Sequence, residues 1–90
     1  MSSIEIPQEA LTKYIERRKA DLETCKKALQ QKDFDAIARV GHQVKGNATT
    51  FGFDALSTIA IDLEKYAHSK DVGGLEKVMT RFTQFLANTK

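Results

Sequence analysis

Apolar residues recur at spacings of three and four along almost the whole chain, and this periodicity constrains the fold more than any other feature. Such spacing places apolar side chains on one face of an α-helix. The 90 residues contain a single proline, at position 7, so no later proline interrupts a helix. The pattern predicts helices over about residues 7–31, 34–51 and 54–68, and a fourth that begins after Gly73-Gly74.

Short connections separate these helices, and no segment shows the alternation expected of a strand. Turns are predicted near Lys32-Asp33, Gly52-Phe53 and Ser69–Gly74, with Asp33 and Asp54 as helix N-caps. Four amphipathic helices joined in this way predict an all-α fold, an antiparallel up-down-up-down four-helix bundle. We expect residues 1–90 to form a single domain, in which residues 1–6 are a short N-terminal extension.

Composition and charge argue against several classes of protein. No apolar run approaches the ~20 residues of a membrane span, and the start of the chain does not resemble a secretory signal. The net charge of +2 is mild and the basic residues are scattered, which argues against a nucleic-acid interface. Cys25 lies alone on a core face, and its spacing from His42 and His68 matches no common zinc pattern. We therefore expect a cytoplasmic monomer that binds no metal, membrane or nucleic acid.

The segment His42-Gln43-Val44-Lys45-Gly46 holds a histidine, a cation and a position without a side chain within about one helical turn. On a helical wheel His42 lies about 130° from the centre of the apolar stripe, on the solvent side. Arg39, Lys45, Gly46 and Thr49 share its exposed arc. An exposed glycine costs about 1 kcal/mol relative to alanine in a helix, and core packing does not explain it. These features predict a histidine that carries a phosphoryl group for a docking partner.

A carboxylate is expected beside this histidine. If the second and third helices fold back about residue 53, His42 lies level with Glu64. A carboxylate there can accept a hydrogen bond from one ring N–H and leave the other nitrogen free to attack. Ile61 points to solvent on the side of Glu64 and is a candidate contact for a partner, whereas His68 is interpreted as an ordinary surface residue.

Gly41-His42-Gln43-Val44-Lys45-Gly46-Asn47-Ala48-Thr49-Thr50-Phe51-Gly52 resembles the signature of histidine-containing phosphotransfer (HPt) domains. That signature is a histidine, any residue, a small aliphatic residue, lysine, glycine, a small polar residue and a small residue, followed by a hydrophobic residue and glycine. The likeness extends from about Tyr14 to the C-terminus, and it includes Leu63-Glu64.

The resemblance implies a phosphate carrier in a two-component phosphorelay, without kinase activity or a cofactor of its own. His42 would accept the phosphoryl group on its distal nitrogen, Lys45 would steady the phosphoryl oxygens, and Gly46 would allow close docking. The implied partners are a histidine kinase or hybrid kinase and a response-regulator receiver domain, which brings the aspartate and Mg²⁺. Some chemotaxis-type HPt domains have a glutamate at the position of Glu64 and several relay types have glutamine, so the relay class stays open.

Two other functions are compatible with a small helical domain. The first is an interaction module that binds a partner without being phosphorylated. The second is a small DNA-binding domain, suggested by the isoelectric point of 8.8. Because the basic residues are not gathered on one recognition helix, the sequence argues against the second.

Overall fold

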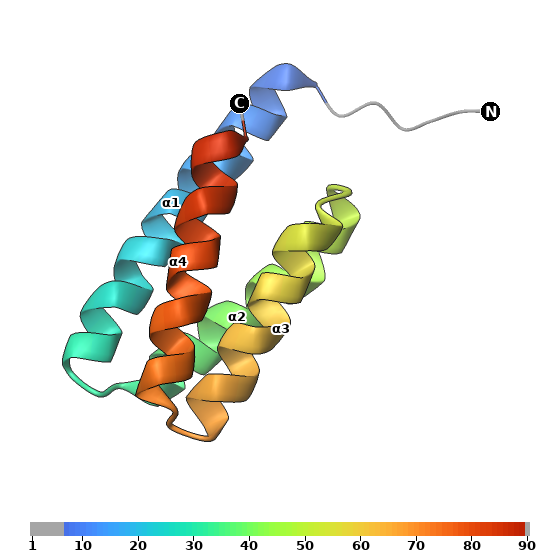
Figure 1. Cartoon of the computed structure of the whole chain (residues 1–90). Helices are drawn as coiled ribbons and strands as arrows, with labels where there is room; N and C mark the ends of the chain where they lie inside the picture. Colours follow the sequence, from blue (N-terminus) through green and yellow to red (C-terminus); the bar gives the residue numbers. More distant parts are fainter. Residues whose placement is uncertain (1–6, 90) are drawn as a thin grey trace.

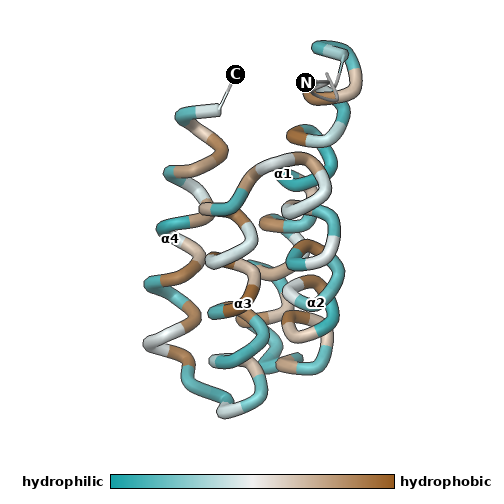
Figure 2. The backbone as a smooth tube through the Cα atoms, turned by 90° about the vertical axis from the view of Figure 1, so that its right-hand side faces the viewer, coloured by the Kyte–Doolittle hydropathy of each residue, from teal (hydrophilic) through white to brown (hydrophobic). Residues whose placement is uncertain are grey.

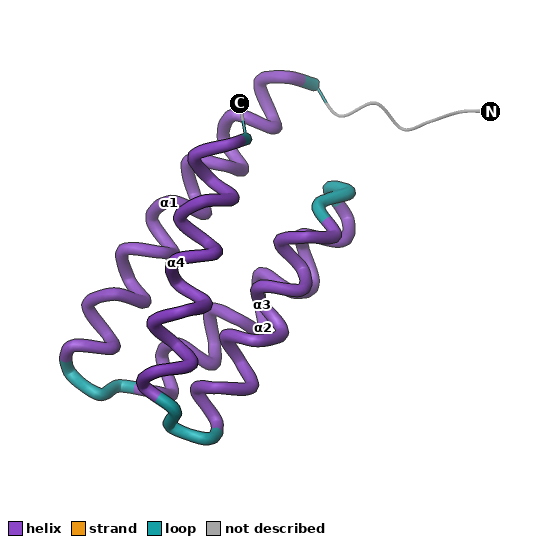
Figure 3. The backbone as a smooth tube through the Cα atoms, viewed as in Figure 1, coloured by secondary structure: helices purple, strands orange, loops and turns teal. Residues whose placement is uncertain are grey.

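The computed structural model describes residues 7–89, and helices account for nearly all of them (Figure 1). The bounds are Gln8–Gln30 for α1, Phe34–Thr50 for α2, Asp54–His68 for α3 and Val72–Asn88 for α4. Figure 3 shows helices joined by short turns, with no strand in the described part of the chain. The all-α prediction is confirmed, while the predicted extension over residues 1–6 lies outside the described residues.

The helices form an antiparallel bundle in which each helix packs against its sequence neighbours and α1 also packs against α4. The pairs α1 with α3 and α2 with α4 lie across the bundle, and among the described residues no Cα atoms of these pairs come within 8 Å of each other. Hydrophobic and hydrophilic residues alternate along every helix in Figure 2, as amphipathic helices require. The up-down-up-down arrangement is therefore confirmed. None of the described helices is both long and apolar enough to cross a membrane.

The core draws aliphatic and aromatic side chains from all four helices. Its largest fully buried members are Ile37, Leu56, Leu63, Leu75 and Phe82. An aromatic cluster lies beside the turn between α2 and α3, where the ring of Tyr14 stacks on Phe51 at 4.2 Å and lies 5.7 Å from Phe53. This cluster fastens α1 to the turn that sets the position of α3 relative to α2.

All three turns have the same construction and the same length of three residues. In each, the middle residue has a positive φ, which is 59° at Lys32, 80° at Gly52 and 55° at Lys70. The next residue then donates its N–H to a carbonyl five residues earlier, as in a Schellman motif. These bonds join Asp33 to Ala28 at 2.8 Å, Phe53 to Ala48 at 2.8 Å and Asp71 to Tyr66 at 2.9 Å. That donor residue is also the N-cap of the following helix.

Two predictions about helix starts are wrong in detail. The N-cap of α3 is Phe53, and Asp54 is the first helical residue, where its charge complements the helix dipole. The pair Gly73-Gly74 lies inside the first turn of α4, because Asp71 caps that helix and accepts the Gly74 N–H at 2.9 Å. By contrast, the prediction that Asp33 caps α2 is confirmed by its 3.2 Å bond from the Ala36 N–H.

Helices α2 and α3 approach closely at Gly41. A Cβ atom on Gly41 would lie 2.8 Å from the Ala60 carbonyl oxygen and 2.9 Å from the Glu64 backbone nitrogen. The missing side chain of this glycine therefore admits the backbone of α3. The close approach brings the exposed edges of the two helices together, and these edges carry the candidate site.

Candidate functional site

The site lies along the shared edge of α2 and α3, and its register follows from the turn at residues 51–53. A fold-back about residue 53 pairs residues that are equally far from it along the chain. Two such pairs meet: Thr49 Oγ1 lies 3.2 Å from Ser57 Oγ, and His42 Nδ1 lies 3.5 Å from Glu64 Oε2. The predicted adjacency of His42 and Glu64 is therefore confirmed.

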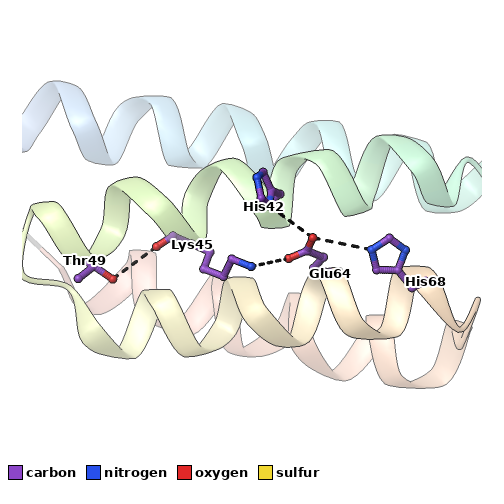
Figure 4. Close-up of polar contacts among 5 residues, drawn as sticks. All are labelled: His42, Lys45, Thr49, Glu64 and His68. Carbon is purple, nitrogen blue, oxygen red and sulfur yellow. Dashed lines mark hydrogen bonds and ion pairs between the residues drawn. The ribbon is translucent and has the colours of Figure 1, made fainter.

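The carboxylate of Glu64 is the centre of the site (Figure 4). Its Oε1 accepts a hydrogen bond from Lys45 Nζ at 3.0 Å. Its Oε2 faces two imidazoles, at 3.5 Å from His42 Nδ1 and 3.7 Å from His68 Nε2. The Glu64 side chain is 22% exposed, whereas that of His42 is 71% exposed. A partly buried carboxylate thus contacts an exposed histidine through one oxygen and a lysine through the other.

Electrostatics keep this carboxylate ionised. The hydrogen bond from Lys45 is the main cause that lowers the pKa of Glu64, and partial desolvation opposes it. The positive charge of Lys45 and the two neighbouring histidines lower this pKa further. A negative group therefore faces Nδ1 of His42 at neutral pH.

The contact between His42 and Glu64 is longer than was predicted. The fold-back about residue 53 predicts a hydrogen bond, yet 3.5 Å exceeds the usual N–H···O range of about 2.7–3.2 Å. The short contact of this carboxylate is made instead by Lys45, whose ammonium lies 3.0 Å from the other oxygen, Oε1. Nδ1 still faces Glu64, so Nε2 is the nitrogen left for a reactant outside the bundle.

The other residues predicted for the docking surface are exposed, but they do not all join this network. Thr49 Oγ1 donates a hydrogen bond to the Lys45 carbonyl oxygen at 3.4 Å. Figure 4 marks this contact with a dashed line. Gly46 has open space on its Cβ side, with no atom within 4 Å. Ile61 is 47% exposed and Arg39 is exposed on α2. No hydrogen bond or ion pair links Arg39 or Ile61 to His42 within residues 7–89.

His68 also belongs to the site, a role that the sequence prediction did not include. It was interpreted as an ordinary surface histidine, but it reaches the same oxygen of Glu64 as His42 does. The signal was present in the sequence, because residues four apart on a helix are neighbours and Glu64 precedes His68 by four.

Asn47, which directly follows the histidine segment, links α2 to α1. Its Oδ1 accepts hydrogen bonds from Tyr14 Oη and, at 3.1 Å, from Arg18 Nη1. Burial raises the pKa of Tyr14, so its hydroxyl stays protonated and can donate. Arg18 lies over the Tyr14 ring at 4.6 Å and pairs with Asp21 at 2.7 Å. These contacts hold the far side of α2 while its His42 side faces solvent.

Other chemistry on the described residues is limited. Residues 7–89 contain no group of three or more His, Cys, Asp or Glu side chains arranged to hold a metal ion. Cys25 is fully buried, and this burial raises the pKa of its thiol to about 12. Surface hollows lie between α1 and α4 and beside the first half of α1, and they include neither His42 nor Glu64. The candidate site is therefore an exposed surface of the bundle, open to a protein partner.

Comparison with known proteins gives the family. Neither the comparison with curated proteins nor that with solved structures gave a match. One family model, described as Hpt domain, matches residues 9–90. Because this match covers almost the entire sequence and all four helices, the chain belongs to the Hpt domain family.

Proposed function

We propose that this chain is a phosphoryl carrier of a two-component phosphorelay, and that His42 accepts and donates the phosphoryl group. Hpt domains are phosphotransfer modules rather than kinases, and they act with kinases and receiver domains. The observation that carries the proposal for His42 is geometric. Its imidazole is 71% exposed, and its Nδ1 faces an ionised carboxylate that is hydrogen-bonded to Lys45.

The transfer step can be written with its charges balanced. Nδ1 keeps its proton, which points to Glu64, and the lone pair of Nε2 attacks the phosphorus atom of an aspartyl phosphate. The bond between phosphorus and the aspartate oxygen breaks, and its electron pair returns to that carboxylate. The imidazole ring becomes cationic as the new N–P bond forms. The negative charge of Glu64, 3.5 Å away, stabilises this cation.

Lys45 has a second partner in this proposal. In the structure its ammonium is held by Glu64 at 3.0 Å, and its side chain is 39% exposed. A lysine is a compact charge on a flexible stem, so it can turn from the carboxylate to the phosphoryl oxygens on His42. It then offsets negative charge that gathers on those oxygens during transfer.

The docking surface is proposed to surround His42. Gly46 presents open backbone, so a partner can approach α2 closely at that level. Arg39, Thr49 and Ile61 supply a charge, a hydroxyl and an apolar contact around it. The proposed partner is the acidic site of a receiver domain, which brings the aspartate and Mg²⁺, or a histidine kinase or hybrid kinase that donates the group. We further propose that the chain acts as a monomer in the cytoplasm.

Transfer from a phosphorylated receiver domain tests the proposal. His42→Gln should abolish uptake of radiolabelled phosphate, while the matched variant His68→Gln should still be labelled. The label should be acid-labile and alkali-stable, as expected for an N–P bond. Normal labelling of His42→Gln would show that another residue is the acceptor. A wild-type chain that binds receivers without being labelled would be an interaction module instead.

A further inference from the structure

We propose that His68 is a positioning residue for phosphoryl transfer at His42, and that its protonated form slows transfer by drawing the Glu64 carboxylate away. The proposal rests on the proposed function of His42. It concerns a different residue, on the other helix, that does not touch the phosphoryl group. Its basis is the sharing of one carboxylate oxygen by two histidines.

The geometry makes the two histidines competitors. Glu64 Oε2 lies 3.5 Å from His42 Nδ1 and 3.7 Å from His68 Nε2, so neither contact is at full hydrogen-bond length (Figure 4). Lys45 holds the other oxygen at 3.0 Å. The carboxylate can therefore pivot about its bond to Lys45, and shortening one imidazole contact lengthens the other.

Protonation decides which histidine attracts the carboxylate more strongly. Histidine is the side chain whose charge ordinarily changes between about pH 5 and 8. A cationic His68 attracts Oε2, which weakens the hold of Glu64 on the Nδ1 proton of His42. The tautomer with free Nε2 then loses part of its preference, and fewer His42 side chains are ready to attack.

The charged groups around this carboxylate come from two helices. Helix α2 supplies His42 and Lys45, and α3 supplies His68 from its own last turn. Among residues 7–89, neither α1 nor α4 forms an ion pair with Glu64 or His68. The His68 side chain is 69% exposed, so replacing it removes no core packing.

Two substitutions at one position separate the charge of His68 from its shape. His68→Gln is neutral at every pH, and His68→Lys keeps the positive charge at every pH. Lys65→Gln on the same helix is the control for a changed surface charge, because Lys65 makes no ion pair with Glu64. Phosphoryl transfer from a receiver is timed for each protein at about pH 8 and about pH 6.

The charge of His68 should set part of the pH dependence. In each protein, the transfer rate at about pH 8 is divided by the rate at about pH 6. This ratio should be about two- to fivefold lower in His68→Gln than in wild type, the range expected for an exposed ion pair. His68→Lys should slow transfer by a similar factor at about pH 8, and Lys65→Gln should follow the wild-type profile. Profiles that are identical for wild type, His68→Gln and His68→Lys would overturn the proposal.

The tautomer of His42 gives a readout that does not depend on phosphorylation. Nitrogen NMR should show that His68→Lys lowers the fraction of His42 with a protonated Nδ1, and that this effect vanishes in a Glu64→Gln background. An unchanged tautomer ratio in His68→Lys would overturn the positioning role, even where transfer proceeds normally. Failure of every variant and of wild type to take up phosphate would instead refute the proposed function, while the tautomer measurement would still test His68.

Discussion

Gly41 and Gly46 lie in the same helix, yet the structure predicts opposite effects for the same substitution. A Cβ on Gly41 would meet the Ala60 carbonyl oxygen at 2.8 Å and the Glu64 nitrogen at 2.9 Å. Both are backbone atoms, which cannot rotate away as a side chain can. A Cβ on Gly46 would meet nothing within 4 Å.

The magnitudes follow from two opposing contributions. Overpacking a closely packed contact costs about 1–3 kcal/mol, and rigid backbone neighbours place Gly41→Ala near the upper value. Alanine recovers about 1 kcal/mol of helix propensity, which leaves Gly41→Ala destabilised by about 2 kcal/mol. Gly46→Ala has only the gain in helix propensity, so it should be stabilised by about 0.8–1 kcal/mol. In a domain of this size, the Tm of Gly41→Ala should fall by about 8–16 °C. The Tm of Gly46→Ala should rise by about 4–8 °C.

Thermal and urea unfolding followed by circular dichroism measure both variants against wild type. Gly41→Ala should also separate Glu64 from His42, because the added methyl group pushes on the Glu64 backbone itself. Its His42 tautomer ratio should therefore change as well. If Gly41→Ala proved as stable as wild type, or if both variants shifted Tm in the same direction, the close approach of α2 and α3 at Gly41 would be refuted.

Three further predictions concern docking, acid stability and thiol reactivity. Gly46→Glu should keep its helicity and Tm but lose binding to a receiver domain, measured by titration calorimetry; normal binding would remove Gly46 from the docking surface. Because the pKa of Glu64 is lowered in the folded chain, its ion pairs stabilise the fold above the ordinary glutamate pKa of 4.5 and lose this effect as the pH falls through the lowered value. Glu64→Gln should therefore unfold with a shallower acid dependence in urea titrations at several pH values, and an unchanged dependence would contradict the Lys45 pairing. Cys25, with its pKa raised to about 12 by burial, should resist thiol reagents until the chain is unfolded, whereas rapid modification of the native protein would contradict its burial.

Much of the fold could be predicted because a few strong local signals agree. The spacing of apolar residues defines each helix, and Asp33 and Gly52 mark helix ends by their own chemistry. The prediction of Asp54 as the N-cap of α3 is wrong for a physical reason. Phe53 becomes the N-cap because its backbone N–H is bonded to the Ala48 carbonyl in the preceding helix. The helix therefore starts at Asp54, without a side-chain cap.

The sequence predicted that His42 lies beside Glu64, but not that Glu64 also contacts Lys45 and His68. The fold-back about residue 53 is enough to bring His42 beside Glu64. The length of that contact and the bond from Lys45 to the other carboxylate oxygen do not follow from this register. Helical spacing places His68 beside Glu64, but the rotamers of these side chains decide whether the imidazole faces the carboxylate.

Because of the short turn between α2 and α3, the site depends on the number of residues between His42 and Glu64 as well as on their identity. Residues 51–53 end one helix and cap the next, so this turn has no spare residue. One residue added ahead of Glu64 would either break the backbone bond from Phe53 to Ala48 or, if it were taken up into α3, rotate Glu64 by about 100° about the helix axis. Every residue of the histidine segment would remain in place, yet the carboxylate would be gone from His42. The number of residues between His42 and Glu64 is therefore as much a mark of this site as the two residues themselves.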